Sequence, residues 1–357
     1  MTRRPAAIPF LLLSALAGGC GRHEGHDSGL HPVSVIGEVG QSPGQFAFPR
    51  AIDTDGRCLW VIDKAGRVQR IEIATGKCLE CWRMPETELG KPTGVTVFNG
   101  DPPLLFVPDT HYQRVMVYAI HPVDEKAPVE RATPEPVARF GKRGKGPGEF
   151  IFPTDIAVIP TADGKKPARL YIAEYGDNDR ISVYEPDGSG GYAFKTSFGH
   201  WGDGSDVNSV EFNRPQSISL DMARGELIVA DAGNHRLGRL TLEGKLVRWI
   251  GSSAEVGDEP GHFHYPWAVV AMGDGTAMVV DQASARVQRI DLTTGSSLGS
   301  YGEPGPGPGQ LAMPWALAIT DHRMYVVDAS NNRVVVADVP KPQPAPQPAV
   351  ASTGGTR

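Results

Sequence analysis

One short sequence, VADAGNHRL, places a carboxylate and a guanidinium close together: Asp231 precedes Arg236 across a turn-forming Ala-Gly-Asn. An ion pair of this kind could serve a reaction at an active site, or it could hold the chain in place. In the structural case the carboxylate accepts hydrogen bonds from N–H groups of the turn. The guanidinium then forks onto a carboxylate or onto carbonyl oxygens of a neighbouring segment. The number of copies of the pair distinguishes the two cases.

The acidic residue and the arginine recur together at intervals of about 50 residues, a period typical of a propeller or solenoid. The six pairs are Asp63 and Arg67, Asp109 and Arg114, Glu174 and Arg180, Asp231 and Arg236, Asp281 and Arg286, and Asp328 and Arg333. A catalytic pair need occur only once, whereas a repeat fold needs the same contact in every unit. We therefore interpret these pairs as structural.

Each copy has a second feature upstream, a proline followed by an alternating apolar strand, as in FAFPRAIDTD (46–55) and LAMPWALAITD (311–321). Glycine-rich links such as GKRGKGPGEF precede most of these prolines. Four short antiparallel strands in each unit, repeated six times, predict an all-β fold, a six-bladed β-propeller of four-stranded antiparallel blades. The last unit lacks an outer strand, and PVSVIG (32–37) resembles the outer strand KLVRWIG (245–251). We expect this N-terminal strand to close the ring.

The pattern V-x-D-x-x-N-x-R-[VIL], preceded by G-x-G-P-G-x-F-x-x-P, resembles that of the NHL-repeat six-bladed β-propeller family, in particular exported bacterial members. The resemblance covers roughly residues 33–339. The second unit diverges most from the pattern, with Pro108 before Asp109 and no Gly-Pro-Gly link, and the third has Glu174 in place of the aspartate.

The two ends of the chain differ from the repeats. Residues 1–20 resemble a signal peptide: Arg3 and Arg4 precede an apolar stretch, 8–17, that is shorter than the roughly 20 residues of a membrane-spanning helix. LAGGC resembles a lipobox, so Cys20 is the expected site of lipid attachment; an ordinary signal peptide cut near the same point is the alternative. We expect a flexible tether at 21–31, the propeller at 32–339 and a disordered, proline-rich tail at 340–357. These features predict an exported protein, periplasmic or at the cell surface, attached to the bacterial membrane through lipid only.

Composition limits the partners. The formal net charge is −6 and no dense basic run occurs, which argues against a nucleic-acid partner. We expect a monomer that binds an envelope protein or a small ligand. If Cys20 carries lipid, Cys58, Cys78 and Cys81 remain. The C-x-x-C of the last two falls on an expected strand, where residues i and i+3 lie roughly 10 Å apart, too far for a disulfide without a bulge. We interpret all three thiols as mainly structural.

Function is expected where the repeats differ from one another. The residues that follow the six landmark prolines should lie near one mouth of the central channel: Arg50, Thr93, Thr154, Gln216, Trp267 and Trp315. Together with Asp155, two tryptophans and an arginine could form an aromatic-lined pocket with polar groups. The predicted ligand-binding residues are Arg50, Thr154, Asp155, Gln216, Trp267 and Trp315. The alternative is that the two tryptophans only plug the channel.

Two enzyme classes on related propellers provide a test. In NHL-type amidating lyases, zinc is held by histidines near the starts of the inner strands, and none of the corresponding positions here is a histidine. Lactonase-like propellers need a cluster of Glu, Asn and Asp for calcium, and Asp155 is the one candidate. We therefore expect no catalytic residue, no metal site and no cofactor. The sequence predicts a non-catalytic binding or scaffolding propeller at the bacterial cell envelope. The alternative is a metal-dependent lyase or lactonase-like hydrolase with a divergent axial site.

Overall fold

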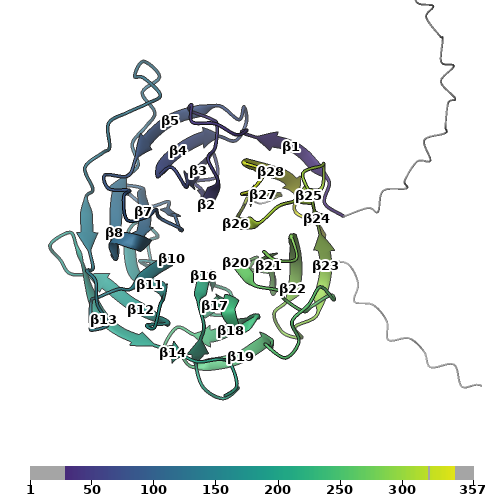
Figure 1. Ribbon diagram of the computed structural model, residues 1–357. Helices are drawn as coiled ribbons and strands as arrows, with labels where there is room; N and C mark the ends of the chain where they lie inside the picture. Colours follow the sequence, from purple (N-terminus) through teal and green to yellow (C-terminus); the bar gives the residue numbers. More distant parts are fainter. Residues whose placement is uncertain (1–28, 321, 342–357) are drawn as a thin grey trace, which may run out of the picture.

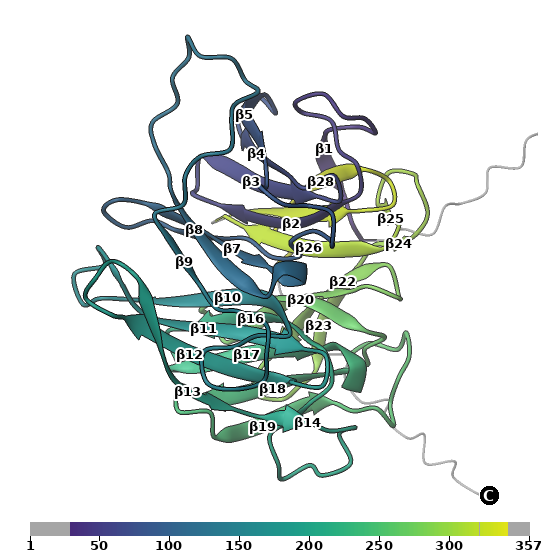
Figure 2. The same ribbon diagram turned by 60° about the vertical axis from the view of Figure 1, so that its left-hand side comes forward.

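The computed structural model describes residues 29–320 and 322–341 and shows six four-stranded antiparallel sheets arranged around a central axis (Figure 1). This is the predicted six-bladed all-β propeller. Figure 2 shows the ring from a more lateral direction, with the blades stacked side by side around the axis. We number the blades 1 to 6 in chain order and give the strands of each from the inner edge outwards.

Blade 1 contains β2 (Pro49–Thr54), β3 (Cys58–Asp63), β4 (Arg67–Glu72) and β5 (Cys78–Arg83). Blade 2 contains β6 (Thr96–Phe98), β7 (Leu104–Asp109), β8 (Arg114–Ala119) and β9 (Ala138–Phe140). Blade 3 contains β10 (Phe152–Pro160), β11 (Pro167–Tyr175), β12 (Arg180–Pro186) and β13 (Tyr192–Phe198). Blade 4 contains β16 (Pro215–Asp221), β17 (Glu226–Asp231), β18 (Arg236–Thr241) and β19 (Leu246–Gly251).

Blade 5 contains β20 (Pro266–Ala271), β21 (Thr276–Asp281), β22 (Arg286–Asp291) and β23 (Ser297–Tyr301). Blade 6 contains β26 (Pro314–Ile319), β27 (Arg323–Asp328), β28 (Arg333–Asp338) and β1 (Pro32–Ile36). Four two-residue strands lie in the links between blades: β14 (His200–Trp201), β15 (Glu211–Phe212), β24 (Glu303–Pro304) and β25 (Gln310–Leu311). Two short 3₁₀ helices, η1 (Thr110–Tyr112) and η2 (Ala232–Asn234), form turns between the second and third strands of blades 2 and 4.

Strand composition follows position within a blade. The second strand of each blade lies inside the ring and is covered by the neighbouring blades on both faces, so it is a continuous apolar run. β3 (CLWVID) and β21 (TAMVVD) are buried at every residue. The outer strand β19 (LVRWIG) is partly exposed along most of its length. The core therefore consists of the interfaces between adjacent blades.

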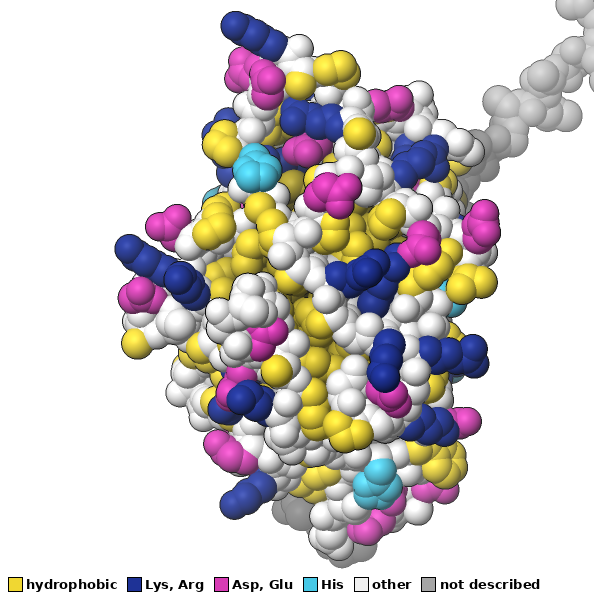
Figure 3. All heavy atoms as spheres, turned by 90° about the vertical axis from the view of Figure 1, so that its left-hand side faces the viewer, with side chains coloured by type: hydrophobic (Ala, Val, Ile, Leu, Met, Phe, Trp, Pro, Cys, Tyr) yellow, Lys and Arg dark blue, Asp and Glu magenta, His cyan; other side chains and the backbone are white. Residues whose placement is uncertain are grey.

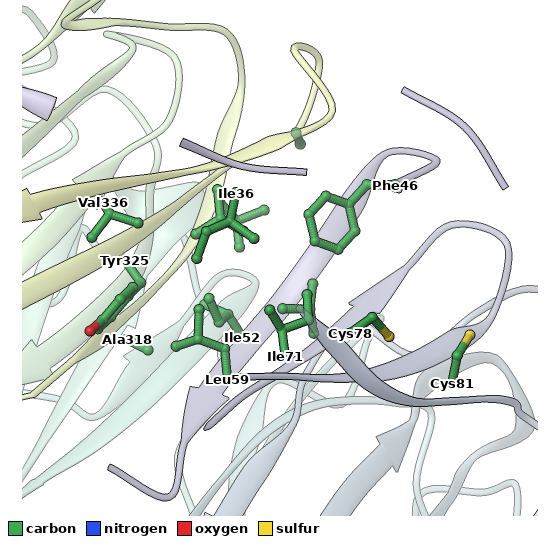
Figure 4. Close-up of a cluster of buried hydrophobic side chains, with 14 residues drawn as sticks. Ile36, Phe46, Ile52, Leu59, Ile71, Cys78, Cys81, Ala318, Tyr325 and Val336 are labelled. Carbon is green, nitrogen blue, oxygen red and sulfur yellow. The ribbon is translucent and has the colours of Figure 1, made fainter. Parts of the chain in front are cut away.

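The N-terminal strand closes the ring, as predicted. β1 pairs antiparallel with β28, with Ile36 opposite Val334, and completes the sheet of blade 6 (Figure 1). Figure 4 shows Ile36 in one apolar cluster with Val336 and Tyr325 from blade 6 and with Leu59 from blade 1. The first and last blades are thus joined by the same strand, and the outer edge of β28 is covered rather than left to pair with another chain.

The recurrent acidic residue and arginine connect the turn of a blade to the link that enters it. In blade 4, Arg236 Nε donates to Asp231 Oδ2 at 2.9 Å and Arg236 Nη2 donates to the carbonyl of Glu211 at 2.8 Å. The second carboxylate oxygen, Asp231 Oδ1, accepts the N–H of Asn213 at 2.7 Å. Asp231 and Arg236 therefore both satisfy backbone groups of the incoming link, which is the structural role expected of this ion pair.

The same contact recurs with local variation. Arg67 donates to the carbonyls of Gly40 and Gln45 in the first link. In blade 2, whose link lacks the Gly-Pro-Gly sequence, Arg114 instead pairs with the Glu86 carboxylate as well as with Asp109. A missing carbonyl-rich link is thus replaced by a second carboxylate.

The long insertion of blade 2 covers the outer edge of blade 1. The N–H of Cys81 donates to the carbonyl of Val129 at 2.8 Å, and the N–H of Arg131 donates to the carbonyl of Cys81 at 2.8 Å. Cys58, Cys78 and Cys81 are buried free thiols, even though a bulge interrupts the pairing of β5 with β4. Figure 4 shows Cys78 and Cys81 at one end of the apolar cluster. Burial raises the pKa of the Cys78 thiol to about 11, as expected for an unreactive cysteine.

Several predictions concern residues outside the described ranges. The signal peptide, Cys20, most of the tether and the proline-rich tail beyond Lys341 lie there. Within the described residues, no helix combines the length and the apolar character that crossing a bilayer requires.

Both described ends of the chain leave the ring from one face. β1 begins at Pro32, opposite Ala337, and β28 ends at Asp338. The other end of β28, at Arg333, belongs to the turn with Asp328. We call the face that carries these six turns and the starts of the inner strands the mouth face. The chain ends therefore lie on the face opposite the mouth face.

Candidate functional site

The residues that follow the landmark prolines lie at the starts of the inner strands, on the mouth face. Five of them are skipped by the pairing between the first and second strands, because the register shifts directly after the proline: Arg50, Thr154, Gln216, Trp267 and Trp315. A bulge releases a residue from the ladder and re-aims its side chain. The bulges therefore explain why this position can vary from blade to blade.

Four of these side chains line a small cavity of about 50 Å³ at the mouth: Thr93, Gln216, Trp267 and Trp315. Asp155 lines the same cavity and also a deeper cavity of about 220 Å³ along the channel axis. Four of the predicted site residues, Asp155, Gln216, Trp267 and Trp315, therefore surround one opening. Arg50 lies beside them, over the Trp315 ring.

Thr154 differs from the other predicted site residues. It is almost fully buried, and its hydroxyl donates to the carbonyl of Ala173 or of Pro215, at 3.2 and 3.0 Å. Pro215 belongs to the next blade, so Thr154 joins blades 3 and 4. The structure does not place its side chain in the wall of the mouth cavity. Thr93, from the more divergent blade 2, takes part in that wall instead.

The two tryptophans form the centre of a longer row of rings, which we call the aromatic arc: Phe48, Trp315, Trp267 and Tyr265. The ring centroids of Trp267 and Trp315 are 4.7 Å apart. Phe48 meets Trp315 edge-on at 5.7 Å, and Tyr265 lies 5.4 Å from Trp267. All four side chains are partly exposed. The arc spans blades 1, 5 and 6 and leaves an accessible aromatic edge at the mouth.

Sequence reasoning missed Phe48, Arg214 and Tyr265, each of which directly precedes a landmark proline. Their φ angles are 56°, 58° and 71°, in the left-handed region that bulky residues rarely adopt. Such strain persists where the surroundings impose it and is common at binding sites. Their position in the repeat was the signal available in the sequence. These residues come immediately before the landmark prolines, just as Arg50, Trp267 and Trp315 come immediately after them.

Hydrogen bonds from the preceding blade hold these strained residues. The N–H of Phe48 donates to Asn332 Oδ1 at 2.8 Å, and the N–H of Tyr265 donates to His235 Nδ1 at 3.1 Å. The N–H of Arg214 donates to Asp179 Oδ1 at 2.6 Å. His235 is therefore a partly buried contact between blades.

Three cationic groups lie on aromatic rings around the mouth. The Arg50 guanidinium is 4.9 Å from the Trp315 ring, and Lys64 Nζ is 5.7 Å from the Phe48 ring. The Arg214 guanidinium is 4.9 Å from the Tyr175 ring. In the part of the chain that the structure describes, none of the three has an ion pair, whereas every turn arginine has one. The mouth thus carries three cationic groups without a close ionic partner in the described chain, on a protein of net charge −6.

Three buried hydrogen-bond donors at the mouth have no partner among the described residues: Arg50 Nε, Gln216 Nε2 and Trp315 Nε1. Gln216 is only 6 % exposed and lines the mouth cavity. A buried donor without an acceptor costs about 1–3 kcal/mol. A ligand that supplies acceptor oxygens would recover that cost.

Deeper in the channel, polar side chains join adjacent inner strands. Asp53 accepts the N–H of Val97 at 2.7 Å, and Asp155 accepts the N–H of Ile218 at 3.0 Å. Burial raises the pKa of Asp53 to about 7 and that of Asp155 to about 6, against the lowering effect of these hydrogen bonds. Both carboxyls therefore titrate close to neutral pH while serving as links between blades.

The titratable side chains near the channel are spread over several blades. Among residues 29–320 and 322–341, no three His, Cys, Asp or Glu side chains are grouped closely enough to hold a metal ion. His235 and His264 approach each other, with ring centroids 5.9 Å apart, but together they offer only two imidazole ligands. The axial carboxyls of Asp53 and Asp155 already accept backbone N–H groups.

Comparisons with known proteins agree with the fold. A model of the NHL repeat matches residues 212–240, from the link before blade 4 into its third strand. The mouse protein "NHL repeat-containing protein 3" is 27% identical over 132 residues, which are 36% of this chain and 36% of that protein. The alignment thus spans about a third of the relative's length.

Solved structures with the same architecture share little sequence. A protein of unknown function from Bacteroides thetaiotaomicron superposes with a TM-score of 0.55 at 13% identity, covering 88% of this chain and 74% of that one. A streptogramin B lyase superposes with a TM-score of 0.50 at 14% identity, covering 86% of this chain and 87% of that one. At these identities the likeness concerns the fold alone.

Proposed function

Because this chain is a β-propeller of the NHL-repeat family, we propose that it is a binding protein of the bacterial cell envelope that engages its ligand at the channel mouth, without catalysis. The observation that carries the proposal is the stacked pair Trp267 and Trp315, partly exposed and 4.7 Å apart at the mouth. Exposed aromatic rings contribute large contact area at low conformational cost, which is why they concentrate at binding sites.

Two further observations separate a binding role from that of a plug. A plug needs only apolar contact with its neighbours, yet the rings at this mouth carry Arg50 and Lys64. Buried donors without partners at Gln216 and Trp315 also favour a ligand over a sealed core.

The positions of the described chain ends are compatible with binding at the mouth face. Both leave the ring opposite the mouth face, so a tether to lipid at Cys20 would leave the mouth face free. The proposed envelope location is supported by the resemblance of residues 1–20 to a signal peptide. On the rim at blades 2 and 3, acidic and basic side chains are interspersed among apolar ones (Figure 3), unlike the single-sign surface that nucleic-acid binding requires.

A capture experiment tests this function. The wild-type protein, the double variant Trp267→Ala/Trp315→Ala and the control Trp201→Ala are immobilised and exposed to envelope extract. Trp201 is a suitable control because it is 58 % exposed but lies in a link, outside the aromatic arc. We expect the wild type and the control to retain the same partner and the double variant to lose it. Capture by a folded double variant would remove the mouth from consideration.

The enzymatic alternative has one observation in its favour, the two axial carboxyls whose pKa values are raised towards neutrality. A metal-dependent lyase or lactonase-like hydrolase would place its metal on this axis. Elemental analysis after dialysis tests it: a stoichiometric divalent ion lost in an Asp53→Asn/Asp155→Asn variant would support the enzyme.

A further inference from the structure

We propose that the mouth recognises a carboxylate through the guanidiniums of Arg50 and Arg214, on a ligand whose planar apolar part packs on the aromatic arc. The inference specifies the ligand class of the proposed binding function and rests on it. The position of both cations on the arc, the sign of their charge and the size of the cavity each support it.

Two guanidiniums contact the same row of aromatic rings. Arg50, from β2 of blade 1, lies 4.9 Å from the Trp315 ring and 6.0 Å from the Phe48 ring. Arg214 precedes β16 of blade 4, and its guanidinium lies 4.9 Å from the Tyr175 ring and 6.0 Å from the Tyr265 ring. Since Trp267 joins Trp315 to Tyr265, cations from blades 1 and 4 contact the two ends of the aromatic arc.

The ligand should carry negative charge. Aromatic rings at a protein surface can attract cations, but here the faces of Phe48, Trp315 and Tyr175 already carry Lys64, Arg50 and Arg214. A cationic ligand would meet three like charges. No carboxylate of the described chain lies within ion-pair distance of these groups, although Asp179 interacts electrostatically with Arg214. An anion from outside would therefore be the first close ionic partner of Arg50 and Lys64.

Cavity size and neighbouring charge favour a carboxylate over a phosphate. The mouth cavity of about 50 Å³ admits a small planar group. Asp155 lies in its wall and would repel a dianion more strongly than a monoanion. Three groups around the mouth cavity without a partner among the described residues, Arg50 Nε, Gln216 Nε2 and Trp315 Nε1, are donors, which matches the acceptor-only chemistry of an ionised carboxylate.

Three probes of similar size test the inference: benzoate, benzamide and benzylammonium share one ring and differ in the charge of the substituent. Binding is followed by tryptophan fluorescence and calorimetry at low salt and pH 7.5. We expect saturable binding of benzoate, at least tenfold weaker binding of benzamide and none of benzylammonium. Arg50→Gln and Arg214→Gln should each weaken benzoate binding about tenfold, and added salt should weaken it in the wild type.

Arg57→Gln is the matched control because Arg57 is 80 % exposed and lies in the turn between β2 and β3, at the far end of the inner strand from the mouth. It should leave benzoate binding unchanged. Thermal unfolding of each variant establishes that the ring is intact. Equal binding by Arg50→Gln, Arg214→Gln and the wild type would overturn the inference.

Peptides distinguish the source of the carboxylate. One has a free C-terminal carboxylate, a second is the same peptide amidated, and a third is amidated but contains an internal glutamate. Binding of the first alone assigns a chain terminus, and binding of the third assigns an acidic side chain. Binding of the amidated neutral peptide as tightly as both others would overturn the inference.

Failure of this inference can be told apart from failure of the proposed function. Benzamide or benzylammonium binding as tightly as benzoate, and lost in Trp315→Ala, would overturn the carboxylate and leave the mouth as the binding face. Absence of saturable benzoate binding also overturns it, and capture from envelope extract then decides the binding function independently.

Discussion

The guanidinium of Arg50, on the inner strand of blade 1, lies 4.9 Å from the ring of Trp315, on the inner strand of blade 6. This contact crosses the junction at which the ring closes. Elsewhere the inner strands are joined by hydrogen bonds, such as those from Val97 to Asp53 and from Ile218 to Asp155. The ring is therefore asymmetric: polar links join blades 1 to 5, and aromatic and cationic contacts join blades 5, 6 and 1 at the mouth.

Removing one member of a turn pair should destabilise the protein strongly. Arg236 and Asp231 are both almost fully buried, so Arg236→Ala leaves a buried carboxylate without its partner, which typically costs about 3–5 kcal/mol. Urea unfolding measures the loss. Arg57→Ala is the matched control, since the exposed Arg57 pairs with Glu72 at 3.7 Å and should contribute less than about 1 kcal/mol. Equal losses for both variants would contradict a structural role of the repeated pair.

Ring closure depends on the inward side of the N-terminal strand. Ile36 is 7 % exposed and packs between blades 6 and 1, so Ile36→Asp buries an unpaired charge and should lower the melting temperature sharply. Val35→Asp, at a position of the same strand that is 48 % exposed, is the control and should change it little. A melting temperature unaffected by Ile36→Asp would show that the strand is dispensable for closure.

Stability should fall as pH rises towards neutrality. Burial raises the pKa of Asp53 to about 7 from an unfolded value near 3.8, so the folded state holds a proton that the unfolded state has released. The stability that this proton contributes is complete below about pH 4 and is lost as pH rises through 7. Asp155 and Asp109, whose pKa values burial raises to about 6, add to the same trend.

Asp53→Asn isolates one part of this dependence. We expect the slope of the unfolding free energy between pH 5 and 7 to become less negative in the variant. Asp187→Asn is the control: hydrogen bonds from Ser189 lower the pKa of this exposed carboxyl, so its titration is complete below that window. A slope in Asp53→Asn identical to that of the wild type would be inconsistent with a buried, protonated Asp53.

Attachment to the membrane should depend on the first cysteine. If Cys20 carries lipid, Cys20→Ser should move the exported protein from the membrane fraction to the soluble periplasmic or extracellular fraction. Immunoblots of fractionated cells measure the distribution, with Cys81→Ser as the control because Cys81 is buried in the propeller. Persistence of the Cys20→Ser protein in membranes would argue for another mode of attachment.

The contacts within a repeat could be predicted from the sequence alone. The pair Asp231 and Arg236 is separated by one turn, so its contact follows from neighbouring positions, and its recurrence specifies the blades. Closure by residues 32–37 was also predictable, because the last unit lacks a strand that the first segment resembles. Both inferences need only short-range geometry and counting.

The mouth could be predicted only in part. Arg50, Gln216, Trp267 and Trp315 were identified from their shared position after a proline, but Thr154 at the same position faces Pro215 of the next blade. The sequence pattern locates the bulge, whereas the packing of adjacent blades decides whether the side chain that it releases reaches the cavity.

The sequence by itself determined the repeats, the number of blades and the position in each repeat where variation is allowed, because these depend on local spacing. Only the tertiary structure decided that Arg50 stacks on Trp315 and that Arg214 stacks on Tyr175. These residues come from four blades, and no periodicity within one blade encodes contacts across the axis. The physical reason is ring closure, which brings the starts of six inner strands that are distant in sequence to one opening. There, side chains that do not take part in the strand ladder lie close together.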